Sequence, residues 1–159
     1  MYRQVDNDPK PAENFKLGNT IALAANNRWV IMANLIPWTE FEGEYAKNFL
    51  TEMGAPAKPF RMALGALIIK EKLGTSDRET VEQIRENPYL QYFIGLEEYQ
   101  DEAPFDASML VHFRQRIGRS LINQINGKIV AENRTQEREE QGEKKSTKDS
   151  ENVIKEKKE

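Results

Sequence analysis

The sequence predicts an all-α protein, a small helical bundle with a helix-turn-helix-like arrangement, a disordered N-terminal segment and a charged C-terminal tail. Apolar residues recur at helical spacing between residues 28 and 130, and helix caps and breakers separate these segments. No segment alternates apolar and polar residues as a half-buried strand does. Residues 1–27 are expected to be flexible, and residues 131–159 to be partly helical or disordered.

The composition excludes several classes of protein. The 159 residues include no cysteine and a single histidine, His112. A disulfide scaffold, a thiolate metal site and a site built from several histidines are therefore ruled out within one chain. No apolar run approaches the roughly 18 residues of a membrane span, and no signal peptide is recognisable. A soluble, cytoplasmic protein without cofactor, metal or membrane partner is expected.

The first helices are expected to be short. One begins at Arg28 and stops before Pro37, because the residue before a proline avoids the helical conformation. A second follows directly, with Thr39 as its N-cap, and residues 54–56 would end the segment. The apolar residues 21–25 could form one more short helix upstream.

The most apolar helix of the sequence follows Pro59. Residues 60–69 are apolar on nearly every side, which predicts a helix at the centre of the bundle. Gly65 indicates close approach of a neighbouring helix, and Gly74 is a helix stop signal.

Two further helices are marked by their caps. Ser76 and Glu79 have the spacing of a capping box, and the helix they begin is expected to run to about Asn87. Pro88 can then start one more helical turn, which Gly95 closes.

A basic segment over residues 105–130 is the candidate for chemistry, in a chain with a formal net charge of −3. Asp106 is expected to cap a helix, and residues 107–119 place Leu110, Phe113 and Ile117 on one buried stripe. The opposite side carries the candidate DNA-binding residues, which are Ser108, His112, Gln115 and Arg119 with Arg114 and Arg116 flanking. Such side chains hydrogen-bond base edges or phosphates. From periodicity and charge alone, a solvated helix face is the commoner interpretation of such a segment.

Four blocks in order carry a family resemblance: Pro59–Gly65, Leu73–Val81, Glu86–Leu96 and Pro104–Gly118. Together they resemble the N-terminal domain of InsH-type insertion-sequence transposases, over roughly residues 28–130. The resemblance implies that this domain recognises the terminal inverted repeats of the element through the segment Ser108–Arg119. It also implies a following catalytic core with a ribonuclease-H-like fold and a DDE triad of metal-binding carboxylates.

The C-terminal part departs from that family. A β-strand with the first catalytic aspartate is expected after the charged linker, whereas this sequence ends within residues 131–159, which resemble the remnant of that linker. We therefore expect a truncated, non-catalytic fragment that binds the inverted-repeat ends in DNA transposition and associates with the nucleoid.

Two alternatives stay open. The chain could be a protein-interaction or dominant-negative module that associates with itself or with intact transposase. The buried helix over residues 60–69 and the apolar stripe over residues 121–130 motivate this alternative. It could also be a decayed gene product without function.

Overall fold

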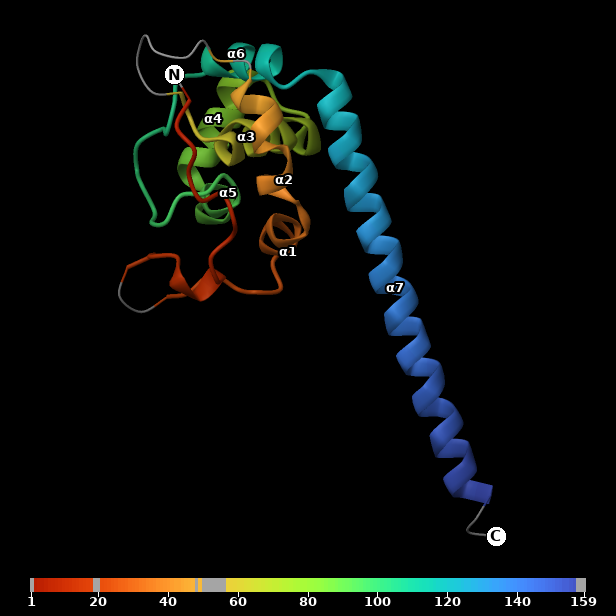
Figure 1. Ribbon diagram of the computed structural model, residues 1–159. Coiled ribbons are helices and arrows are strands. Elements are labelled where there is room, and N and C mark those ends of the chain that lie inside the picture. The colour runs from red at the N-terminus through yellow and green to blue at the C-terminus, as the bar shows by residue number, and fades with distance from the viewer. Residues whose placement is uncertain (1, 19–20, 48, 50–56, 157–159) are drawn as a thin grey trace. The chain divides into compact units, whose positions relative to one another are not determined.

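The computed structural model describes residues 2–18, 21–47, 49 and 57–156. Within these ranges the chain forms one 3-10 helix and seven α-helices and no β-strand, which confirms the predicted all-α class (Figure 1). None of the helices found there combines the length and apolar character needed to cross a membrane. The chain divides into two units, Met1–Ile122 and Asn123–Glu159.

The first unit is a bundle built around one central helix, α3. This helix packs against α2, α4, α5 and α6, while α1 packs against α5. The expected central position of residues 60–69 is thereby confirmed. The bounds of the six α-helices are α1 Arg28–Leu35, α2 Trp38–Ala46, α3 Phe60–Leu73, α4 Asp77–Glu86, α5 Pro88–Phe93 and α6 Met109–Arg116.

The two glycines of the α3 region have the predicted roles. A Cβ atom on Gly65 would lie 3.1 Å from Cγ2 of Ile94, so the absence of a side chain lets the end of α5 approach α3 closely. Gly74 ends α3 in the left-handed conformation, with φ of 63°, which glycine adopts without a steric penalty.

Two of the expected caps differ in detail. The Ser76 hydroxyl accepts from the Glu79 N–H at 3.1 Å as predicted, but the Glu79 carboxylate accepts from Gln83 instead of reaching back. Thr39 does not cap α2, which already begins at Trp38. Its hydroxyl donates to the Asp8 carboxylate at 2.7 Å, because the N-terminal segment passes there.

The short helix expected at residues 21–25 is absent. Leu23 is buried, and the Ala24 N–H donates to the hydroxyl of Tyr89 at 3.1 Å. These contacts with the bundle hold the backbone in a non-helical course. The helix break expected at residues 54–56 lies outside the described residues.

Residues 2–18 contain only one turn of regular structure, the 3-10 helix η1 at Ala12–Asn14, as their turn chemistry predicts. Their side chains nevertheless complete α3. Pro59 provides no side-chain cap, and the first two N–H groups of α3 donate instead to Tyr2 and Asn7, at 3.2 and 3.3 Å. Distant residues thus satisfy donors that a helix start leaves free. The flexibility of this segment stays a prediction.

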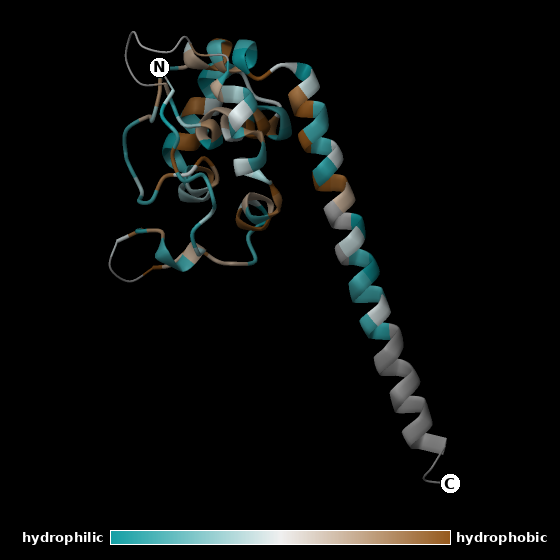
Figure 2. Cartoon of the chain, viewed as in Figure 1, coloured by the Kyte–Doolittle hydropathy of each residue, from teal (hydrophilic) through white to brown (hydrophobic). Residues whose placement is uncertain are grey.

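The last helix, α7, spans Arg119–Glu156, and the second unit consists mainly of this helix. Its described side chains from Arg134 to Lys144 are exposed, and Figure 2 shows hydrophilic residues prevailing along this part of the helix. The helical form is one of the two that the sequence predicts for the tail.

Candidate nucleic-acid interface

The helix α6 is fixed to the bundle by its apolar face. Leu110 and Phe113 are fully buried, Ile117 follows them at the C-terminal end, and the ring of Phe113 packs edge-on against that of Phe105 at 5.2 Å. At the start of the helix the Asp106 carboxylate accepts from the Ser108 N–H at 2.9 Å. The predicted buried stripe is confirmed, and the opposite face of α6 points away from the bundle core. The expected cap is wrong: Ser108 is the N-cap of α6 without a side-chain cap bond, and Asp106 stabilises the turn that precedes the helix.

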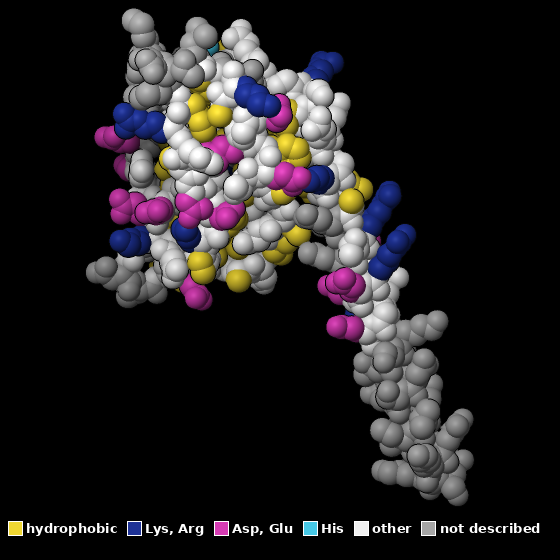
Figure 3. Space-filling view, in the orientation of Figure 1, with side chains coloured by type: hydrophobic (Ala, Val, Ile, Leu, Met, Phe, Trp, Pro, Cys, Tyr) yellow, Lys and Arg dark blue, Asp and Glu magenta, His cyan; other side chains and the backbone are white. Residues whose placement is uncertain are grey.

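That outward face carries a row of exposed side chains. Ser108, His112 and Gln115 are all exposed, as the helical spacing predicts, and Val111 lies among them. In contrast, acidic side chains prevail among the charged groups on the face of the first unit seen in Figure 3. A polyanion would be repelled by such a face, so a contact with nucleic acid is favoured only where acidic groups are sparse.

Arg114 is held by a partner inside the protein. Its guanidinium donates two parallel hydrogen bonds to the Asp77 carboxylate, at 2.8 and 3.0 Å, and thereby ties α6 to the start of α4. Lys70 reaches the same carboxylate at 3.3 Å. These contacts lower the pKa of Asp77, first through the hydrogen bond from Arg114.

We expect Arg114→Ala to raise the pKa of Asp77 towards its ordinary value of 3.8. A lowered carboxyl pKa stabilises the folded state above the unfolded value, and this gain is lost as the pH falls through the folded value. The substitution should therefore cost at most about 1 kcal/mol at pH 7, since the pair is partly exposed, and less at pH 3. NMR titration of the carboxyl groups measures the pKa of Asp77, and urea unfolding at pH 7 and pH 3 measures the loss in the free energy of unfolding. A cost that is equal at pH 7 and pH 3 would contradict it.

Arg116 also faces the protein. Its guanidinium lies over the ring of Phe49, 4.5 Å from the centroid. Burial raises the pKa of Tyr45, and the charge of Arg116 nearby opposes that shift. The DNA-binding role of Arg114 and Arg116 stays a prediction, but both side chains already join elements of the bundle.

Arg119 belongs to a different helix from the other candidates. The helix is expected to end at about Ile117, and α6 ends at Arg116, whereas α7 begins at Arg119. Placing Arg119 on the same helix face as the other candidates is therefore wrong. Ile117 leaves the helical conformation, with φ of −104° and ψ of 89°, and Gly118 follows with low helix propensity. Arg119 therefore lies beyond a break in the backbone, not on the same helix face.

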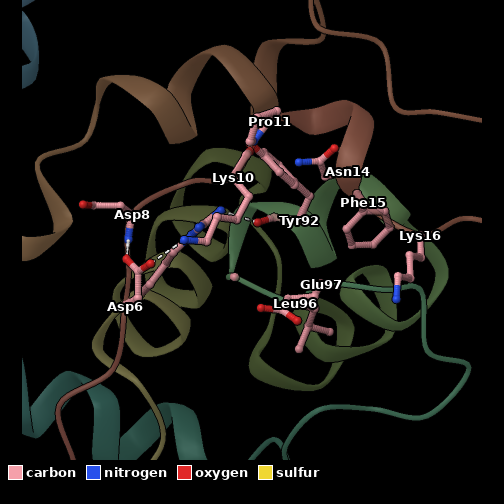
Figure 4. Close-up of a pocket in the computed structure, with 12 residues that line it drawn as sticks. Asp6, Asp8, Lys10, Pro11, Asn14, Phe15, Lys16, Tyr92, Leu96 and Glu97 are labelled. Atoms are coloured by element: carbon pink, nitrogen blue, oxygen red, sulfur yellow. Dashed lines mark hydrogen bonds and ion pairs between the residues drawn. The ribbon is translucent and has the colours of Figure 1, made fainter.

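A second polar feature lies between the N-terminal segment and residues 92–97. It is a cavity of about 210 Å³ (Figure 4). Within its wall Lys10 forms an ion pair with Asp6, and the hydroxyl of Tyr92 donates to the carbonyl of Lys10. These groups satisfy one another and hold the N-terminal segment in place.

Arg61 lines this cavity and is only 5% exposed. Its guanidinium donates to the backbone carbonyls of Asn7, Tyr92 and Phe93, two of them at the C-terminal end of α5. Burial lowers its pKa to about 10, so the group is still charged at neutral pH. Sequence reasoning missed this residue, although a single charged side chain among the otherwise apolar residues 60–69 was the available signal.

Within residues 2–18, 21–47, 49 and 57–156, no group of three or more His, Cys, Asp or Glu side chains is arranged to hold a metal ion. The loop over residues 97–104 is acidic, but it contributes a backbone carbonyl and N–H, those of Gln100, to the buried amide of Gln91. We therefore place the candidate site on α6.

The chain is similar to a protein family and to a curated protein. The model of the family described as transposase domain (DUF772) matches residues 20–116, which include α1 to α6. A curated protein of Rhizobium meliloti, named "Uncharacterized protein ORF8 in nfe locus", is 42% identical over 89 residues. That similarity covers 56% of this chain but 42% of the relative, so the chain matches less than half of the relative's length. No solved structure matches the chain.

Proposed function

The chain belongs to the transposase domain (DUF772) family, and on this premise we propose that its first unit binds DNA at the inverted-repeat ends of a transposable element. The observation that carries the proposal is the exposed polar row of α6, held outward by a fully buried apolar stripe. A major groove admits such a helix and distinguishes all four base pairs by their hydrogen-bonding edges. The helix is also the last one inside the segment that matches the family.

The side chains of the row have distinct capacities. The amide of Gln115 suits the paired donor and acceptor of adenine, and the hydroxyl of Ser108 can bond either kind of base edge. His112 offers a ring nitrogen to a base or phosphate. Arg119, at the start of α7, suits a phosphate, which would fix the position of α6 rather than read sequence. Binding of this kind would place the chain at the nucleoid.

We expect Gln115→Ala to weaken binding to the inverted repeat about tenfold, because a bidentate base contact is worth about 1–3 kcal/mol, and to change binding to scrambled duplex little. Arg119→Ala should weaken both complexes and reduce the slope of log K against log salt by about 0.9. Gel-shift titrations at two salt concentrations measure both effects.

Arg85→Ala is the matched control, because this arginine pairs with Glu82 at the C-terminal end of α4, whereas Arg114 of α6 bonds Asp77 at the other end. It should leave the affinity for the repeat within about twofold. The proposal fails if the unmodified chain binds repeat and scrambled duplex equally. It also fails at α6 if neither Gln115→Ala nor Arg119→Ala changes the affinity.

The two apolar segments that motivate the alternative of self-association differ in their exposure. Of the nine apolar or glycine residues within 60–69, eight are buried and Ile68 is partly exposed, so α3 offers no free apolar face there. The apolar stripe over residues 121–130 keeps an exposed member, Val130. Association with itself or with intact transposase, truncation and the lack of catalysis all stay predictions.

A further inference from the structure

Val111 occupies the middle of the exposed face of α6. It lies three residues after Ser108 and four before Gln115, the spacings that bring side chains together on one helix face. Both neighbours are exposed and polar, whereas Val111 is apolar and 43% exposed. The row therefore alternates a hydrogen-bonding group, a small apolar surface and a second hydrogen-bonding group.

Folding gives no reason for valine at this position. A β-branched side chain is less favourable in a helix than alanine or a straight chain, and this one is not buried against the bundle. The core of α6 is provided by Leu110 and Phe113 on the other face. Single exposed apolar residues are common. Val111 differs from them in lying between two side chains that are able to bond bases.

We infer that Val111 reads the 5-methyl group of a thymine, and so makes the recognised site depend on an A·T pair beside the base that Gln115 contacts. The thymine methyl is the apolar group that a base pair presents in the major groove, and apolar side chains contact it. The inference rests on the proposed DNA binding and adds to it the kind of base pair that α6 selects.

The test replaces thymine by deoxyuridine in the inverted-repeat duplex, which removes the methyl groups and keeps every hydrogen-bonding edge. The unmodified chain should bind the uracil duplex about fourfold more weakly, the effect of losing one buried methyl-sized group. Val111→Ala, whose single methyl group extends less far from the helix, should reduce this difference between the two duplexes. Replacing one thymine at a time should locate the effect at a single position.

Ile31→Ala is the matched control, because Ile31 is also an exposed apolar residue, 49% exposed, but lies on α1. It should keep the fourfold difference between the duplexes. Equal ratios in the unmodified chain and in Val111→Ala, with binding to the repeat intact, would overturn this inference and leave the proposed function standing. Failure of the unmodified chain to prefer the repeat would overturn both.

Discussion

Arg61→Met is expected to lower the free energy of unfolding of the first unit by about 3 kcal/mol. Methionine keeps most of the apolar stem but removes the five donors of the guanidinium. The carbonyls of Asn7, Tyr92 and Phe93 would lose their hydrogen bonds from Arg61 inside the protein. Stacking of the guanidinium on Trp38, at 5.5 Å from the ring centroid, would be lost as well.

Urea unfolding of the full chain, followed by circular dichroism, measures this loss as a shift of the midpoint. Arg61→Lys should recover part of it, because an ammonium group can reach one of the carbonyls but cannot match the planar fork. Arg85→Met is the informative control. Arg85 has three carboxylates within 4 Å, yet it lies on the surface, and its replacement should leave the midpoint almost unchanged. A larger effect at Arg85 than at Arg61 would contradict the argument.

Phe113→Ala is expected to cost about 3–5 kcal/mol, the usual range for deleting a buried phenyl ring. Phe113 is fully buried and packs against Phe105, and it joins α6 to the bundle. The cavity left behind would loosen α6 at its middle. Affinity for the inverted repeat should then fall even at temperatures where the variant is folded, because the exposed row is no longer held in one orientation.

Thermal and urea unfolding measure the first effect, and gel-shift titration well below the transition measures the second. Val111→Ala, on the opposite face of the same helix, separates the effect on stability from the effect on DNA affinity. It should leave stability within about 0.5 kcal/mol of the unmodified chain. Phe113→Leu should cost about 1–1.5 kcal/mol, since most of the volume is retained. Unchanged stability of Phe113→Ala would show that α6 is not anchored through this residue.

Stability and the candidate interface are connected through α3. This helix contacts α6 on one side and α5 on another, and Arg61 on α3 bonds the last carbonyls of α5. The start of α3 is itself completed by Tyr2 and Asn7. The N-terminal segment, α3 and α6 therefore form one chain of contacts, although their sequences are far apart.

The sequence by itself determined the helical class, the order of the helices and the two faces of α6. These features depend on local signals: Pro37, Gly74 and Pro88 limit helices through their own backbone geometry. The buried stripe of α6 follows from the 3.6-residue period, which places Leu110 and Phe113 together whatever the rest of the chain does.

Only the tertiary structure decided which polar groups have partners. Arg61 donates to residues 31 to 54 positions away, and Arg114 pairs with Asp77, 37 positions away. Thr39 likewise bonds a distant residue, Asp8, and does not cap α2 as the sequence predicts. A hydrogen bond between distant residues depends on where folding brings them, and burial makes it energetically important. No local sequence pattern contains this information. The sequence therefore could not show that Arg114 and Arg116 contact the protein, or that Arg119 belongs to the next helix.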